Sequence, residues 1–361
     1  MQQMIPPFHG LPSGTKIMLA FSGGVDSAVA AHLCKEAGLD VLAVNMRFLP
    51  GAERTEEEVR SVADALKIPL QFLDLRSDFR ELVMRRCWDV FDSGKTPNPC
   101  AICNPVFKFG RMLEFAEQNQ CKALATGHYV QKVLTSHGRP ALCRGIHKAK
   151  DQSYFLFGLT PEQVERACFP LGNMEKDDVR AIADRLGLPN AKAKESQDAC
   201  FTPPDGSLAE MLRQEFGGKI HPGCFIHAET GKILGRHKGI HAYTIGQRKG
   251  TGIALGTPAY VRQIDAAHGN VYITADEQTL FQDVLLAENV NWQSVDPQTE
   301  PFRAMVQIRY RSPAAPATVT PLPDGTCEVR FDQPLRAITP GQAAVFYGES
   351  NDAITGGGFI R

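Results

Sequence analysis

The first half of the chain alternates short apolar runs with amphipathic segments, and this alternation constrains the fold more than any other feature of the sequence. Strand and helix patterns that alternate in this way predict a parallel sheet covered by helices on both faces. The expected strands are 16–21, 40–46, 69–75 and 122–126, and the expected helices are 25–37, 55–66, 79–90 and 106–117.

After about residue 206 the pattern changes to a short helix, 207–216, followed by many strand-like runs broken by Gly and Pro. This spacing favours small β-barrels or sandwiches. We therefore expect an α/β fold in which a parallel-sheet catalytic domain (1–206) precedes two small, mainly β domains. The first is a central, mostly β domain (207–278), and the second is a β-barrel-like domain (279–361) that contacts a partner.

Composition excludes several classes of protein. Apolar residues make up 43% and charged residues 22% of the 361 residues, as in soluble globular proteins. No stretch approaches the roughly 20 apolar residues that cross a bilayer, and the first residues lack a secretory pattern, so we expect a cytoplasmic protein that contacts no membrane. The net charge of −1 gives no global sign of nucleic-acid binding, but basic clusters at 236–238, 248–249 and 309–311 leave a local RNA surface possible.

The sequence SGGVDS (22–27) stands directly between the first expected strand and the first expected helix. Glycines there let the backbone approach a ligand closely. The free N–H groups and the positive dipole end of the helix point at an anion, and Ser22 and Ser27 add hydroxyl donors. The loop is neither a Walker A sequence nor G-x-G-x-x-G. An ordinary glycine turn with a Ser or Asp helix cap is the alternative to a phosphate-binding loop.

SGGVDS resembles the PP-loop of the ATP pyrophosphatases. Members of that superfamily hold pyrophosphate in this loop and transfer AMP to a carbonyl or carboxyl oxygen. The resemblance implies an adenine nucleotide alpha hydrolase-like domain, ATP as the cosubstrate, cleavage between the α and β phosphates, and Mg²⁺ as the counter-ion.

Three of the ten cysteines stand in polar or proline-rich contexts. Cys100 and Cys103 form a C-x-x-C pair after Thr-Pro-Asn-Pro, and Cys200 ends the run ESQDAC. A thiolate or persulfide is a good nucleophile toward an activated carbonyl. The alternatives are that the C-x-x-C pair is half of a zinc site or a thioredoxin-like redox pair, and that Cys200 is a simple packing residue. Pairing of Cys103 with Cys200 requires Cα atoms within roughly 7 Å, which sequence alone does not show.

Further motifs resemble those of the tRNA-specific 2-thiouridylases, and this likeness extends from the first strand to the last residues. They are TPNPCAICN at 96–104, ATGHY at 125–129, KDQSYFL at 150–156, KESQDACF at 194–201, HKGIHAYTIGQRKGTGI at 237–253, RYR at 309–311 and TPGQAAVFY at 339–347.

The resemblance implies roles for the matching residues. Cys103 would be the nucleophile, and Cys200 would carry the incoming persulfide. Asn98, Pro99 and Cys100 would lie against the target base, and Lys150, Asp151, Gln152, Arg309 and Tyr310 would contact tRNA. The residues that would contact ATP are Ala20, Phe21, Ser22, Gly23, Gly24, Val25, Asp26, Ser27, Met46 and Gly127.

Two features depart from the family pattern. This chain has Cys100 where well-known members carry an Asp, to which an acid/base or positioning role has been given. The segment after Met46 is also shorter than in some relatives. The extra cysteine raises an alternative in which Cys100, Cys103 and Cys200 hold a [4Fe–4S] cluster whose free iron binds sulfide.

The reaction that the resemblance implies begins with adenylation of O2 of the wobble uridine and release of pyrophosphate. Sulfur from the Cys200 persulfide, supplied by a cysteine desulfurase or a sulfur-relay protein, then replaces the activated oxygen, directly or as sulfide freed by Cys103. AMP leaves, and a Cys103–Cys200 disulfide would need an external reductant. The rival predictions are a PP-loop synthetase that acts on a small carboxylate, and a tRNA-binding or cluster-carrying module without ATP turnover.

Overall fold

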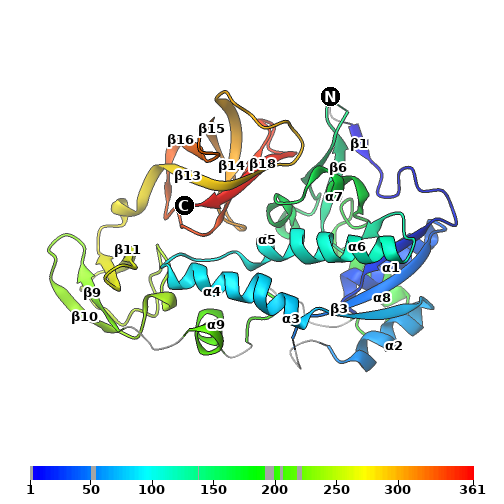
Figure 1. Cartoon of the computed structure of the whole chain (residues 1–361), viewed down its shortest axis with the longest axis horizontal. Helices are drawn as coiled ribbons and strands as arrows, with labels where there is room; N and C mark the ends of the chain where they lie inside the picture. Colours follow the sequence, from blue (N-terminus) through cyan, green and yellow to red (C-terminus); the bar gives the residue numbers. More distant parts are fainter. Residues whose placement is uncertain (1–2, 50–53, 137, 192–198, 204–205, 218–221) are drawn as a thin grey trace.

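The computed structural model describes residues 3–49, 54–136, 138–191, 199–203, 206–217 and 222–361. The chain forms an α/β part, a small central sheet and a closed barrel, as Figure 1 shows. The order of these parts confirms the expected fold class. The exact domain limits remain our prediction. Within the described residues, no helix has the length and apolar character needed to span a membrane.

A five-stranded parallel sheet organises the first part, in the order β4-β3-β2-β5-β8. Neighbouring residues of β2 face opposite sides of the sheet: Ile17 and Leu19 join the core beneath α1, α2 and α8, whereas Met18 joins the core beneath α6. Burial on both faces explains why the centre of β2 is continuously apolar. The strands are β2 (Lys16–Ala20), β3 (Asp40–Arg47), β4 (Leu70–Asp74), β5 (Leu124–Ala125) and β8 (Ala167–Cys168).

The four expected helices are present, and one of them begins earlier than expected, whereas the helices at 161–166 and 176–185 were not predicted. The helix expected at 106–117 begins at Pro99, because Asn98 caps it and Pro99 takes the first helical position, where its missing N–H costs nothing. Cys100 and Cys103 therefore lie in the first turn of a helix, a turn that the helix expected at 106–117 did not include. The helices are α1 (Val25–Glu36), α2 (Glu56–Leu66), α3 (Arg76–Phe79), α4 (Arg85–Asp92), α5 (Pro99–Cys103), α6 (Met112–Gln118), α7 (Pro161–Arg166) and α8 (Lys176–Arg185), with π-helical segments η1 (Arg80–Met84) and η2 (Asn104–Arg111).

A small antiparallel sheet, which the sequence did not predict, lies beside the parallel one. It consists of β1 (Gln3–Ile5), β6 (Val130–Leu134) and β7 (Pro140–Arg144), and a bridge from Cys143 to Ala353 ties it to the barrel. Two 3₁₀ turns follow, η3 (Lys148–Lys150) and η4 (Ser153–Leu156). Lys150 ends η3, and Asp151 and Gln152, also predicted to contact tRNA, lie between the two turns.

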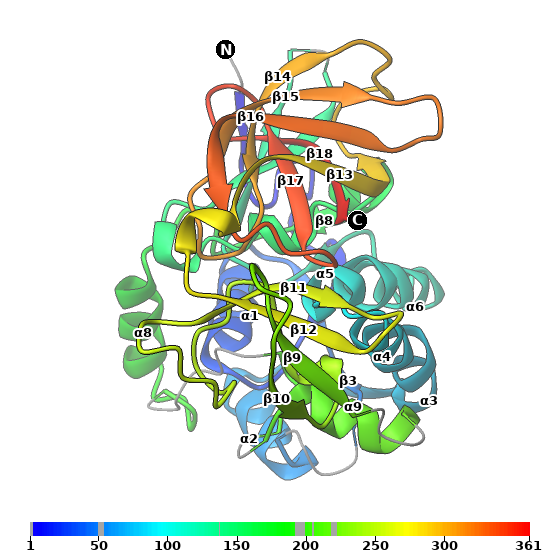
Figure 2. The same cartoon turned by 90° about the vertical axis from the view of Figure 1, so that its left-hand side faces the viewer.

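The central part is a four-stranded sheet around Phe225, Val261, Val271 and Ile273. Helix α9 (Leu208–Phe216) precedes it and packs against α4. Figure 2 shows this sheet below the barrel. Its elements are β9 (Gly223–His227), β10 (Ile233–His237), η5 (Ile240–Ala242), β11 (Tyr260–Asp265), β12 (Asn270–Thr274) and η6 (Glu277–Leu280).

The C-terminal part is a closed antiparallel barrel in the order β13-β16-β15-β14-β17-β18. It shares a core with the first part, since Leu156 and Phe157 pack with Val345 and Ile354. Its strands are β13 (Phe281–Trp292), β14 (Phe302–Gln307), β15 (Ala315–Pro321), β16 (Cys327–Arg336), β17 (Ala343–Tyr347) and β18 (Ile354–Ile360).

Candidate functional site

The loop SGGVDS joins β2 to α1 at the point where the strand order reverses, with β3 on one side of β2 and β5 on the other. Ligands of open parallel sheets bind at such points. The two serines close the loop on itself: their hydroxyls lie 3.2 Å apart, Ser22 Oγ accepts from Gly24 N at 3.3 Å, and Ser27 Oγ donates to Gly24 O at 3.0 Å. Met46 on β3 and Gly127 after β5 lie at the same edge of the sheet.

Two buried asparagines, which sequence reasoning missed, hold the carbonyls of this loop. Asn45 Nδ2 donates to Phe21 O at 2.8 Å, and Asn190 Nδ2 donates to Gly23 O at 2.6 Å. Within the described chain neither Oδ1 atom has a hydrogen-bond partner. A buried unpaired acceptor costs about 1–3 kcal/mol, so both oxygens suit a donor supplied from outside the protein. Asn45 is the one polar residue inside the apolar run VLAVNM, and this sequence signal could have identified it.

Asp26 is the acidic residue of the loop, and its carboxylate is held from two directions. Tyr129 Oη donates to Asp26 Oδ1 at 2.7 Å, and Lys176 Nζ lies 2.6 Å from the same oxygen. Lys176, the first residue of α8, is only 5% exposed. A β-carbon on Gly127 would lie 3.1 Å from the backbone of Asp26 and Ser27, so a side chain there would crowd the loop. Tyr129 belongs to the ATGHY motif, whereas no sequence signal marked Lys176.

The predicted cysteines come together around the first turn of α5. Cys103 is 6% exposed, Cys100 is half-buried and Cys200 is exposed. Burial raises the pKa of Cys103 to about 12, the positive charge of Lys108 opposes that rise, and the neighbouring Cys200, Cys100 and Cys87 thiols add to it. The sequence analysis did not single out Cys87, which lies on α4 and whose pKa burial raises to about 12.

Aromatic packing anchors the segment that carries Cys200. Phe201 is buried and meets the ring of Phe79 edge to face, with centroids 5.2 Å apart. Phe201, Cys103 and Phe107 belong to one apolar cluster, against which Met46 also packs. One cluster therefore connects the expected nucleotide edge of β3 with Cys103 and with the segment that carries Cys200. Residues 194–198 of the KESQDACF motif lie outside the described residues.

The three cysteines do not fit the cluster alternative as they are placed. None of the ten cysteines forms a disulfide, so Cys103 and Cys200 are not joined. Across the described ranges, no three Cys, His, Asp or Glu side chains converge as ligands for a metal ion. The mechanism proposed below therefore uses no [4Fe–4S] cluster.

The residues predicted to contact tRNA form two groups around α5, the helix that carries Cys100 and Cys103. Asn98 is buried and caps α5 through Oδ1, which accepts from Ala101 N at 3.2 Å. Burial raises the pKa of Tyr310, and Asp151 and Cys100 raise it further, whereas Arg311 opposes the rise. Tyr310 packs against the apolar cluster that contains Ala101 of α5. Tyr310 also packs on Phe155, with ring centroids 4.4 Å apart.

Asp151 and Gln152 are held by the protein itself. The Asp151 carboxylate accepts from Gly145 N at 3.1 Å and from the Ser153 hydroxyl at 2.9 Å, while Gln152 Oε1 accepts from Tyr129 N at 3.1 Å. Both side chains therefore shape the surface around Lys150, which is half-buried.

Arg144, another residue that the sequence analysis missed, connects this turn to the barrel. Its Nη1 donates to Asp151 Oδ2 at 2.9 Å and to Gln307 Oε1 at 3.0 Å. Gln307 Nε2 in turn donates to the carbonyls of Arg309 and Tyr310. The Arg309 guanidinium turns inward to Ala337 O at 2.7 Å and to Thr339. Arg309 thus orders the barrel loops as well as offering positive charge.

Family models match nearly the whole chain. The model described as tRNA methyl transferase HUP domain matches residues 15–204, the tRNA methyl transferase PRC-barrel domain matches 209–275, and the aminomethyltransferase beta-barrel domain matches 282–360. A curated tRNA-specific 2-thiouridylase MnmA from Syntrophotalea carbinolica is 44% identical over 351 residues, which cover 95% of this chain and 98% of that protein. This chain belongs to the tRNA-specific 2-thiouridylase family.

Other 2-thiouridylases are similar over the same length. The proteins of Magnetococcus marinus and Clostridioides difficile are 41% and 39% identical, and each alignment covers 96% of this chain and 98% of the relative. Among solved structures, a 4-thiouridine synthetase–RNA complex with bound ATP aligns over 58% of this chain and 52% of its own, with 19% identity and a TM-score of 0.36. That structural likeness is too weak to bear on the site.

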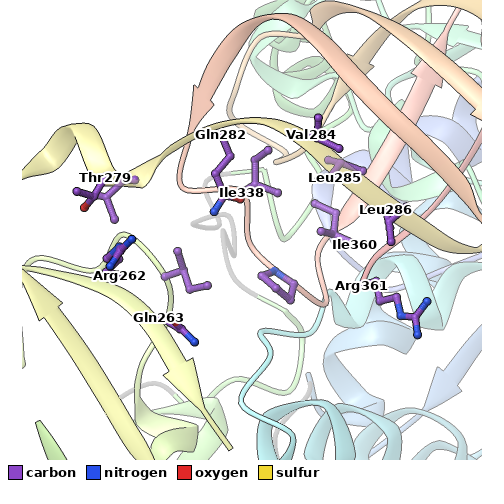
Figure 3. A pocket seen from close by; sticks show the side chains of 13 residues that line it. Arg262, Gln263, Thr279, Gln282, Val284, Leu285, Leu286, Ile338, Ile360 and Arg361 are labelled. Atoms are coloured by element: carbon purple, nitrogen blue, oxygen red, sulfur yellow. The ribbon is translucent and has the colours of Figure 1, made fainter. Parts of the chain in front are cut away.

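Two further regions contain none of the predicted site residues. A pocket of about 420 Å³ lies between the central sheet and the barrel, and its lining includes Arg262 on β11 and Leu285 on β13 (Figure 3). None of its lining residues is a predicted site residue. In the basic cluster 236–238, His237 is buried against Phe225 and Tyr243, so it is not part of a basic surface.

Proposed function

We propose that this chain catalyses the ATP-dependent 2-thiolation of the wobble uridine of tRNA. The observation that carries this proposal is the apolar cluster shared by Met46, Cys103 and Phe201. It connects the nucleotide edge of the sheet to Cys103 and to the residue that follows Cys200, in a chain that is 44% identical to a 2-thiouridylase. Activation of a carbonyl oxygen and delivery of sulfur require these components near one another.

The phosphate loop performs the first step. Its free N–H groups and the hydroxyls of Ser22 and Ser27 hold the pyrophosphate part of ATP. Uridine O2 attacks the α-phosphorus, the bond from that phosphorus to the bridging oxygen breaks, and pyrophosphate leaves with the electron pair. Asp26 offers the oxygen ligand that Mg²⁺ prefers, and the ion would neutralise charge on the phosphates. The target base must be unstacked, which an anticodon loop permits at low cost.

The cysteines perform the second step. The terminal sulfur of a Cys200 persulfide attacks the electron-poor C2, and the Cys103 thiolate attacks Cys200 Sγ. The sulfur–sulfur bond of the persulfide then breaks, a Cys103–Cys200 disulfide forms, and AMP leaves with the former O2 of uridine. The two thiolates thereby supply the two electrons that reduce the transferred sulfur, and an external reductant restores them. Exposure of Cys200 suits its loading by a protein persulfide donor.

Replacement of Cys200 tests this assignment. We expect Cys200→Ser to abolish 2-thiouridine, measured by mass analysis of nucleosides from tRNA incubated with ATP and a persulfide donor. Pyrophosphate release that depends on tRNA should persist, because adenylation precedes sulfur transfer. Cys224→Ser, on β9 of the central sheet, is the matched control and should thiolate normally. Normal thiolation by Cys200→Ser would refute the role, and pyrophosphate release without tRNA would favour a synthetase for a small substrate.

A further inference from the structure

The charges around the phosphate loop are unevenly compensated. Lys176 is paired with Asp26 inside the protein at 2.6 Å. Arg54, on the short connection between β3 and α2, is half-buried and forms no ion pair with any residue that the structure describes. A guanidinium that is partly removed from water and not neutralised is suited to an anion, since burial without a partner is unfavourable.

The Arg54 guanidinium lies against the phosphate loop. A β-carbon built on Gly24 would be 3.6 Å from Arg54 Nη1 and 3.3 Å from Ser22 Oγ, so both donors border the same point of the backbone. Helix α2 packs there as well, because a β-carbon on Gly23 would be 3.1 Å from Val59 Cγ2. The guanidinium, the Ser22 hydroxyl and the N-terminal end of α1 therefore surround one small region.

The backbone at Arg54 is fixed without help from its side chain. Arg47 Nη1 donates to Arg54 O at 2.8 Å. Thr55 caps α2: its hydroxyl accepts from Glu58 N at 3.2 Å, and its own N–H donates to Glu58 Oε2 at 2.7 Å. The chain thus places the guanidinium by bonds that substitution of the side chain leaves intact.

We propose that Arg54 binds the pyrophosphate part of ATP and stabilises the charge that develops on it as the bond to the α-phosphorus breaks. A planar guanidinium can bond two phosphate oxygens at once, and cations beside a departing phosphate lower the barrier to its release. This inference rests on the proposed function for the reaction step, but binding of pyrophosphate itself needs neither tRNA nor sulfur.

Calorimetry of the full chain with inorganic pyrophosphate and MgCl₂, and separately with AMP, tests the inference. For Arg54→Gln we expect the Kd for pyrophosphate to rise about tenfold, as expected for loss of one charge-assisted contact, while the Kd for AMP stays within about twofold. Arg54→Lys should recover part of the affinity because it keeps the charge. Arg60→Gln is the matched control, since Arg60 lies on α2 over the ring of Phe72 and should bind pyrophosphate as the parent chain does.

Three outcomes would overturn the inference: unchanged pyrophosphate binding by Arg54→Gln, an equal loss of AMP and pyrophosphate binding, or a parent chain that binds no pyrophosphate. Failure of the proposed function has a different signature. In that case pyrophosphate binding would depend on Arg54, yet tRNA incubated with ATP and a persulfide donor would contain no 2-thiouridine.

Discussion

Burial gives the two predicted reactive cysteines different chemistry. Cys200 is exposed, whereas Cys103 lies in the apolar cluster with Phe107 and Phe201. The pKa of Cys103 is raised to about 12 by burial, with Lys108 opposing the rise. Cys103 is therefore a protonated thiol near neutral pH, and the nucleophilic role that we propose for it requires loss of this proton.

Alkylation of the free chain should show this difference. We expect iodoacetamide to modify Cys200 much faster than Cys103 at pH 7. Below a pKa of about 12 the thiolate fraction increases about tenfold for each pH unit, so the Cys103 rate should rise from pH 7 to 10 without a plateau. Peptide mass spectrometry at fixed times measures both rates. A Cys103 rate that levels off near pH 8 would contradict the assigned environment.

The short helix α5 matters because its first turn carries Cys100 and Cys103. Asn98 caps this turn, and Pro99 starts it. The sequence indicated the stiff Thr-Pro-Asn-Pro approach, but it placed the helix start seven residues too late. Apolar periodicity identifies the interior of a helix, whereas its first turn is set by capping, which has little periodic signal.

Loss of this cap should affect catalysis more than stability. We expect Asn98→Ala to lower the free energy of unfolding by about 1 kcal/mol and to reduce the rate of 2-thiouridine formation, because the turn that carries both cysteines frays. Thr160→Ala removes the capping-box side chain of α7, which carries no predicted site residue, and serves as the control. Similar unfolding by urea, with thiolation reduced only in Asn98→Ala, is the expected result. Equal thiolation by both variants would contradict it.

At the scale of the whole molecule, the barrel positions the segment that presents the cysteines. Thr96 N donates to Pro340 O at 2.9 Å, and Gln342 Nε2 donates to the carbonyls of Thr96 and Pro97. Gly341 lies between these contacts with φ of +88°, a conformation that strongly favours glycine. A β-carbon there would be 2.7 Å from Thr96 O.

A side chain at Gly341 should therefore separate the barrel loop from the cysteine helix. We expect Gly341→Ala to reduce thiolation at least tenfold and to destabilise the chain by more than the roughly 1–2 kcal/mol that positive φ costs alanine. Gly325→Ala has a similar φ of +82° but open space around the new methyl group, so it isolates the backbone cost. Thermal unfolding and nucleoside analysis measure both effects. Equal activity of the two variants would show that the docking contact is unimportant.

Local patterns in the sequence determined much of this protein. Strand and helix alternation predicted the parallel sheet, SGGVDS predicted the phosphate loop, and the linear motifs predicted the family. These properties depend on residues that are neighbours along the chain, so they can be read from it. The short strand β8 and the sheet of β1, β6 and β7 were not predicted, because their pairing depends on distant segments.

Only the tertiary structure decided which side chains meet. Asn190, Lys176 and Arg54 come to the phosphate loop from three different segments, and Arg144 connects the turn at Asp151 to the barrel. Cys87 on α4 comes close to Cys100 and Cys103 only because α4 and α5 contribute to the same apolar cluster. The physical reason is that a hydrogen bond or an ion pair acts over a few ångströms in space, whereas the sequence orders residues only along the chain.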